Sequence, residues 1–148
     1  MEQEKFDLKK VKIYRTREGN AFEIAVAILL ITAWTLALFF DKIAAFDFLG
    51  IYLPSVIFTP LAIVLMVVAY HPRYIHYNIP GINGFSNIRQ VALAVRSVRV
   101  IGLAVAMMIL MQNVLIILGK NTEVVSIVFV VVMIFTALLF SFLIYRAK

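Results

Sequence analysis

The chain has 148 residues, of which 64% are hydrophobic and only 15% are charged, and its net charge is +6. Soluble domains are about 45–50% apolar and about 25% charged, and a domain of this size buries only about two thirds of its surface on folding. The composition therefore excludes a typical soluble enzyme, a disordered chain and a fibrous repeat, and it indicates an integral membrane protein. Because the chain has no cysteine, disulfides, thiolate metal sites and thiol catalysis are also excluded.

Four apolar stretches are long enough to cross a bilayer. A hydrocarbon core about 30 Å thick requires roughly 20 helical residues, and such stretches occupy residues 21–40, 51–70, 100–118 and 124–145. The sequence thus predicts one membrane domain over residues 1–148, an all-α bundle of four transmembrane helices. The first stretch is expected to persist as a helix, because signal-peptide cores are shorter, at about 7–15 residues.

Local signals predict where these helices begin and end. Asn20 is the expected N-cap of the first span, Gly119 the expected C-terminal stop of the third, and Asn121 or Thr122 opens the fourth. Pro60, inside the second span, predicts a kink, and Thr59 is expected to satisfy the freed backbone group. Such a helix serves either as inert packing or as a moving hinge.

Basic residues alternate between the segments that connect the spans. Of the 14 lysines and arginines, 12 fall in residues 1–20, in residues 71–99 and after residue 145, whereas the two short connections carry only Lys42 and Lys120. The positive-inside rule therefore predicts that both termini are cytoplasmic. Residues 1–20 mix acids, bases and apolar residues without a clean period, which suits either an interfacial segment or a partner-docking segment.

The segment 71–99 combines an aromatic, basic first part with turn dipeptides at 80–81 and 83–84. Ser86 or Asn87 is then expected to cap a helix that continues unbroken into the third span. Along that helix Arg89, Arg96 and Arg99 fall within a sector of about 80°. These three arginines predict a basic stripe on the helix, and together with Arg73 in the preceding loop they are expected to bind anionic lipid or a protein partner.

This basic segment does not resemble a nucleic-acid module, and no nucleic-acid partner is expected. His71 and His76 lie in it without further ligands nearby in the sequence, so no metal or other cofactor is predicted.

Few polar residues lie inside the predicted spans. Glu23 is expected either to pair with Arg96 or Arg99 or to act in proton coupling, and Gln112 and Asn113 are expected to hydrogen-bond between helices. No nucleophile–base pair, carboxylate pair or phosphate loop can be assembled from these residues. The sequence therefore predicts a protein that is not an enzyme.

Part of the chain resembles a known family. The resemblance is carried by Phe22-Glu23-Ile24, Trp34, Leu53-Pro54, the run 71–77, Ile79-Pro80, Arg89-Gln90, Ala94, Arg96 and Arg99. These residues resemble small bacterial membrane proteins, especially from Bacteroides-like organisms, with a domain of unknown function. Immunity proteins against the sporulation-delaying killing toxin share that domain. The resemblance covers about residues 21–118 and implies a bacterial inner-membrane protein.

One departure from that family concerns the first external loop. The family typically has a Pro-x-His-x-Asn motif there, followed by Gly and Asp, whereas residues 41–50 here contain neither proline nor histidine. A function that depends on that motif would be lost or changed in this chain.

We therefore expect a non-enzymatic inner-membrane protein of sensing, immunity or accessory type, with a basic cytoplasmic segment that contacts anionic lipid or a membrane-protein partner. Two alternatives remain open. One is a small proton-coupled transporter that works as a homo-oligomer and uses Glu23. The other is a structural subunit of a membrane complex.

Overall fold

The computed structural model describes residues 11–40, 48–75 and 85–147, which form helices and loops. The helices are α1 (Arg17–Phe40), α2 (Phe48–Val68), the short 3-10 turn η2 (Pro72–Tyr74), α3 (Ile88–Ile117) and α4 (Glu123–Arg146). The expectations for residues 1–10, for the loop 41–47, for His76 and for both turn dipeptides lie outside the described residues.

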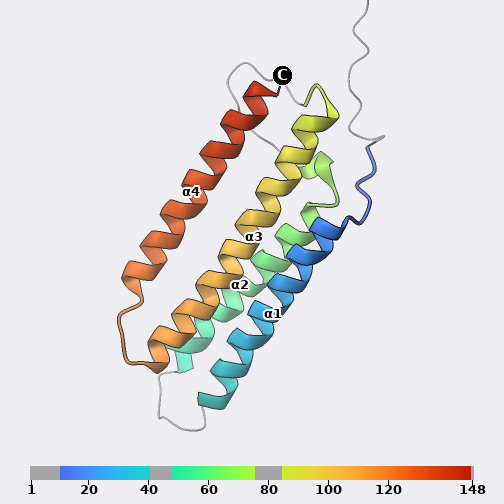
Figure 1. Ribbon diagram of the computed structural model, residues 1–148. Coiled ribbons are helices and arrows are strands. Elements are labelled where there is room, and N and C mark those ends of the chain that lie inside the picture. Colours follow the sequence, from blue (N-terminus) through green and yellow to red (C-terminus); the bar gives the residue numbers. More distant parts are fainter. Residues whose placement is uncertain (1–10, 41–47, 76–84, 148) are drawn as a thin grey trace, which may run out of the picture.

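Helix α3 is the centre of the bundle. It packs against α1 and α2 on one side and against α4 on the other, whereas α1 and α2 contact each other only slightly (Figure 1). The four helices alternate in direction, so α1 and α3 begin at the end of the bundle where α2 and α4 finish. The predicted all-helical bundle is confirmed.

Three of the helices, α1, α3 and α4, are long and apolar enough to cross a membrane. In α2 the part whose side chains the structure describes, Tyr52–Val68, is apolar as well. Much of the apolar surface faces outward, most of all on α4, where Ile144 is the one buried residue. Exposed apolar areas of this extent are unfavourable in water and favourable against lipid tails or another apolar surface.

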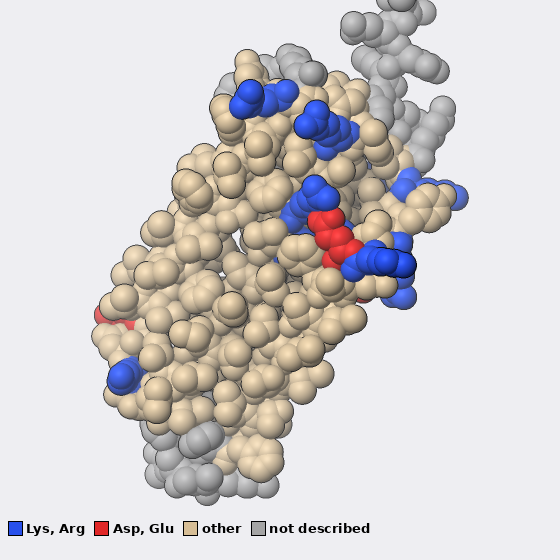
Figure 2. All heavy atoms as spheres, viewed as in Figure 1, with Lys and Arg blue, Asp and Glu red and all other residues tan. Residues whose placement is uncertain are grey.

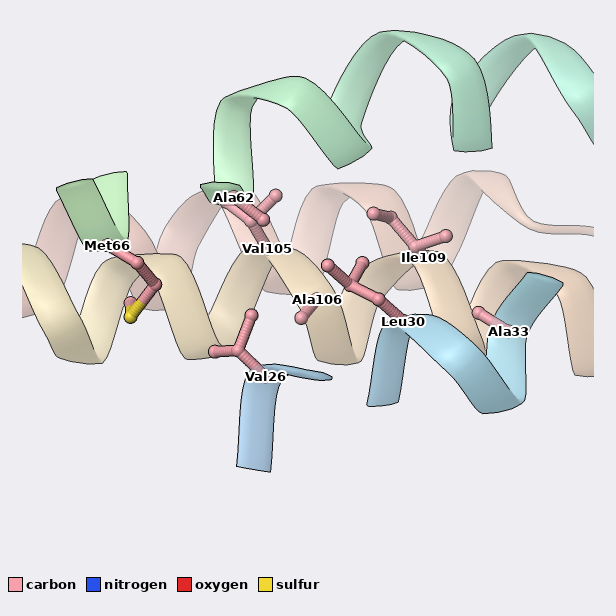
Figure 3. Packing of buried hydrophobic residues seen from close by; sticks show 8 residues of the cluster. All are labelled: Val26, Leu30, Ala33, Ala62, Met66, Val105, Ala106 and Ile109. Atoms are coloured by element: carbon pink, nitrogen blue, oxygen red, sulfur yellow. The ribbon is translucent and has the colours of Figure 1, made fainter. Parts of the chain in front are cut away.

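The largest core cluster lies where α1, α2 and α3 meet (Figure 3). Its buried members are Val26, Leu30 and Ala33 of α1, Ala62 and Met66 of α2, and Val105, Ala106 and Ile109 of α3. Three of the eight are alanines, which allow helix backbones to approach closely, as is usual between membrane helices. Figure 3 shows these small residues interleaved with larger aliphatic side chains from the facing helices.

Helix α1 begins earlier than its apolar run. Its N-cap is Thr16, whose Oγ1 accepts a hydrogen bond from the Gly19 N–H at 3.0 Å, so the expectation that Asn20 caps this helix is wrong. Asn20 lies one turn inside the helix, where its own N–H donates to the Thr16 carbonyl at 2.9 Å. Because Arg17 and Glu18 are good helix formers, the helix continues past the apolar boundary.

Helix α3 has both of the ends that the sequence predicts. The Asn87 side chain accepts a hydrogen bond from the Gln90 N–H at 2.9 Å. At the other end Gly119 adopts φ 65, with hydrogen bonds from Gly119 N to the Ile116 carbonyl and from Lys120 N to the Leu115 carbonyl. These two bonds define a Schellman motif. With 30 residues α3 is about 45 Å long, longer than a bilayer core.

The prolines of α2 leave that helix unbroken, and the start of α4 agrees with the prediction. Helix α2 is continuous through Pro54 and Pro60, and the Thr59 hydroxyl accepts a hydrogen bond from Trp34 Nε1 of α1 at 3.0 Å. At the start of α4, the Asn121 side chain accepts from the Glu123 N–H at 2.7 Å. Asn121 rather than Thr122 therefore satisfies this helix terminus.

Candidate functional site

Cationic side chains gather at the end of the bundle where α1 and α3 begin, which we call the basic end (Figure 2). Its exposed members among the described residues are Lys12, Arg15, Arg17, Arg73, Arg89, Arg96 and Arg146. At the opposite end, the described part of the chain carries one cation, Lys120. The alternation of charge along the sequence thus becomes a separation of charge in space.

Arg96 forms an ion pair between α3 and α1 at the basic end. Its Nε and Nη2 atoms donate to Oε1 and Oε2 of Glu18, both at 2.8 Å. The bidentate geometry fixes the two side chains relative to each other. Because both are about half exposed, water screens the pair, and exposed pairs stabilise a fold by only about 0–1 kcal/mol.

Arg99 is buried, with an exposed fraction of only 4%. Its guanidinium lies over the ring of Tyr70, 5.4 Å from the centroid, and against the backbone of Gly19. The Nη2 atom is buried and donates no hydrogen bond within the described part of the protein. The arginine stripe expected on α3 is therefore divided, since Arg89 and Arg96 face outward and Arg99 faces α1 and α2.

Glu23 interacts with a partner that the sequence did not indicate. Its Oε1 accepts a hydrogen bond from the hydroxyl of Tyr70, two residues after the end of α2. The expected pairing of Glu23 with Arg96 or Arg99 is not what the structure shows, because among the described residues the one ion pair joins Arg96 to Glu18. Glu23 therefore joins α1 to α2 rather than α1 to α3.

A groove of about 900 Å³ runs between α1 and α2. It exists because both helices pack mainly on α3 and little on each other. Aliphatic side chains form most of its wall, among them Leu30, Ile31 and Ile63. The polar groups Arg15, Glu23, Tyr70 and His71 line the end nearest the basic end, and Trp34, Thr35 and Thr59 lie farther along. Its volume is in the range of sites for small molecules, about 300–1,000 Å³.

A second, more polar hollow of about 500 Å³ adjoins the groove. The segment 11–14, which precedes α1, forms one wall, and residues 70–73 form the other. Lys12, His71 and Arg73 line it. The Arg73 guanidinium also lies over the Tyr74 ring, 4.6 Å from its centroid. We call this hollow the basic pocket.

The two amides expected to join helices do so. Asn113, fully buried on α3, donates to the Ala33 carbonyl of α1 at 3.0 Å and to the Ser55 hydroxyl of α2 at 3.2 Å. Gln112 donates to the Ser126 hydroxyl of α4 at 2.8 Å. These bonds hold all four helices together at the end far from the basic end, which is a structural role.

Sequence reasoning missed Gly19, Tyr70 and the segment 11–16 as parts of the site. A partial signal existed, because a glycine within a helix often marks close packing. The contact of Gly19 with Arg99 and that of Tyr70 with Glu23 join residues 80 and 47 positions apart. Such pairs depend on how the helices pack, which spacing within one helix does not specify.

Comparisons of the chain with protein-family models, with curated proteins and with solved structures find no match.

Proposed function

We propose that the protein is a non-enzymatic, polytopic inner-membrane protein of sensing, immunity or accessory type. Its basic end lies at the cytoplasmic face, where it contacts anionic lipid headgroups or a membrane partner. The observation that carries this proposal is the gathering of exposed cations at one end of a bundle with an apolar exterior. Each Lys or Arg near an anionic leaflet contributes about 1 kcal/mol of attraction. The immunity alternative rests on the resemblance of residues 21–118 to the family that shares its domain with toxin-immunity proteins.

In this proposal all four helices cross the membrane. Helix α2 has 21 residues, which at 1.5 Å per residue gives about 31 Å, close to the thickness of the hydrocarbon core. It also lies alongside α1 and α3 in the bundle. Four crossings place both termini on one side, as the distribution of basic residues favours.

The absence of cysteine makes the topology directly testable. We expect a membrane-impermeant maleimide added to intact spheroplasts to label Lys120→Cys, at the end far from the basic end. Tyr14→Cys and Ala147→Cys should react only after the membrane is permeabilised. Labelling of Tyr14→Cys in intact spheroplasts would contradict the proposed orientation, and the cysteine-free parent is the control.

The lipid contact is tested with the exposed arginines. We expect Arg73→Gln, Arg89→Gln and Arg96→Gln, combined in one variant, to reduce the phosphatidylglycerol that co-purifies with the protein in mild detergent. Lys120→Gln, which removes a cation from the opposite end, should leave the co-purified lipid unchanged. Equal lipid content in all three proteins would contradict the proposal, unless the triple variant loses a co-purifying protein instead.

One observation favours a proton-coupled transporter as the second candidate. Glu23 lines the groove, near its charged end, where it would be able to exchange a proton for a lipophilic cation. In this case, binding of tetraphenylphosphonium to the solubilised protein releases protons, and Glu23→Gln abolishes the release. Binding without proton release would exclude this candidate.

The third candidate is a structural subunit of a membrane complex, and the exposed apolar face of α4 supports it. Because Ile144 is the one buried residue of that helix, its remaining surface is available to another membrane helix. Mass analysis of gently extracted complexes tests this: a stoichiometric partner that Val131→Trp removes supports a subunit role, and a monomeric protein excludes it.

A further inference from the structure

The groove and the basic pocket form one continuous feature. Ile13, Tyr70 and His71 line both of them, so the apolar space between α1 and α2 opens directly into the polar space beside η2. The groove is lined mostly by apolar surface, whereas about half of the surface of the basic pocket is polar, with Lys12, His71 and Arg73 among its lining residues. The combined shape fits an amphiphile with a long apolar tail and a polar head.

The groove, which α1 lines from Glu23 to Leu38, is long enough for an acyl chain of one leaflet of a bilayer. From Glu23 at its charged end to Trp34, whose hydrogen bond to Thr59 joins α1 to α2, the chain advances eleven helical residues, or about 16 Å. Half of the hydrocarbon core is about 15 Å. The Trp34–Thr59 bond therefore lies near the depth at which the acyl chain of an inner-leaflet lipid ends.

The charges at the head of this feature select an anion. Lys12 and Arg73 line the basic pocket, and Arg15 lies at the mouth of the groove. The one carboxylate that lines either hollow among the described residues is Glu23, which already accepts a hydrogen bond from Tyr70. Three cations against one carboxylate favour a phosphate group, and Lys and Arg are its usual ligands.

We propose that the basic pocket and the groove together bind one anionic glycerophospholipid of the inner leaflet, with its phosphate near Lys12 and Arg73 and one acyl chain between α1 and α2. This inference rests on the proposed function, which places the basic end at the cytoplasmic leaflet. It goes further because the proposed function needs only a general attraction of the basic end to anionic lipid. The inference instead assigns one lipid to one site, formed by the basic pocket and the groove.

Native mass spectrometry of the detergent-solubilised protein tests the head of the site. The fraction of protein that carries one lipid is measured against concentration for phosphatidylglycerol and for phosphatidylcholine with the same acyl chains. We expect tighter binding of phosphatidylglycerol, and about tenfold weaker binding of it by the Lys12→Gln/Arg73→Gln variant. The matched control, Arg17→Gln/Arg146→Gln, removes the same charge from exposed residues of the basic end that line neither hollow, and it should lose clearly less affinity than the Lys12→Gln/Arg73→Gln variant.

The tail of the site is tested by a second matched pair. Ile31 lines the groove and Ile28 does not, although both belong to α1 and are mostly exposed. Ile31→Trp should obstruct the groove and weaken phosphatidylglycerol binding about tenfold, since each excluded methylene forfeits about 0.8 kcal/mol of burial. Ile28→Trp should leave the affinity unchanged, and because both changes are outward-facing, both proteins are expected to fold.

The possible outcomes distinguish this single lipid site from the proposed function on which it rests. Equal losses of affinity for phosphatidylglycerol in the two charge variants would overturn the single site. They would still agree with a basic end that contacts lipid. Equal affinity for the two lipids, unchanged in every variant, would overturn both. Full displacement of the lipid by glycerol 3-phosphate, or equal effects of the two Trp changes, would show that the groove holds no acyl chain. Displacement of phosphatidylglycerol by tetraphenylphosphonium in the parent, but not in Glu23→Gln, would assign the groove to the transporter function.

Discussion

A Cβ atom on Gly19 of α1 would lie 2.7 Å from Nη2 and 2.9 Å from Cζ of Arg99 on α3. The bare backbone of Gly19 therefore provides the space in which a buried guanidinium lies. The same guanidinium lies over the ring of Tyr70, from the chain just after α2. Arg99 of α3 thus contacts both α1 and the chain that follows α2.

The contact between Gly19 and Arg99 predicts the effect of a larger residue at position 19. Gly19→Leu should lower the free energy of unfolding by about 1–3 kcal/mol, because overpacking a filled site forces side chains and backbone to shift. Thermal unfolding in detergent measures the change. The control is Asn20→Leu, on the exposed side of the same turn, which should have little effect.

A double variant identifies the cause of that loss. If Arg99 is the group that the new side chain displaces, Gly19→Leu should cost clearly less in an Arg99→Ala background than in the parent. Additive effects of the two changes would contradict a direct clash.

The burial of Arg99 leads to a prediction of the opposite sign. Arg99→Met should leave stability unchanged or raise it by up to about 2 kcal/mol, because it removes a buried donor without a described partner and keeps much of the volume. The exposed residue Arg89 provides the control, and Arg89→Met should change the unfolding temperature little. A clear loss of stability in Arg99→Met alone would show that the guanidinium has an interaction worth more than its burial costs.

The sequence predicted the bundle because apolar runs of bilayer length leave few alternatives, and it predicted the ends of α3 because Asn87 and Gly119 act within their own turns. It placed the start of α1 too late, because hydropathy marks the edge of the apolar run, whereas the helix continues through Arg17 and Glu18. Local chemistry at Thr16, rather than hydropathy, determines that boundary.

The site was less predictable than the fold. The spacing of Arg89, Arg96 and Arg99 predicts that they share one sector of α3, but it does not specify which part of that sector a neighbouring helix covers. The packing of α1 and α2 buries Arg99, brings Arg96 to Glu18 and leaves Arg89 exposed. The groove likewise depends on how far apart α1 and α2 lie. The sequence of either helix alone does not predict that distance.

The ion pair of Arg96 with Glu18 should contribute little to stability. A double-mutant cycle with Arg96→Gln and Glu18→Gln is expected to give a coupling energy below about 1 kcal/mol, because both side chains are about half exposed. The coupling should fall further in 1 M salt, where the Debye length is only about 3 Å. A coupling that persists unchanged at high salt would indicate that the pair is shielded from water in the folded protein.

Asn113 is the polar residue whose loss should destabilise the bundle most. Its amide donates to both α1 and α2 from a fully buried position, so Asn113→Leu should cost about 1–2 kcal/mol, at about 0.6 kcal/mol for an average bond between membrane helices plus the strain of a new shape. Gln112→Leu is the informative comparison. It removes one hydrogen bond to Ser126, but it also removes a buried Oε1 that lacks a partner among the described groups. Its effect on the free energy of unfolding should therefore be clearly smaller. Unfolding temperatures of the two variants in the same detergent decide the order. A larger loss for Gln112→Leu would mean that α4 is held mainly by that amide, and that the contact of α3 with α1 and α2 depends on apolar packing alone.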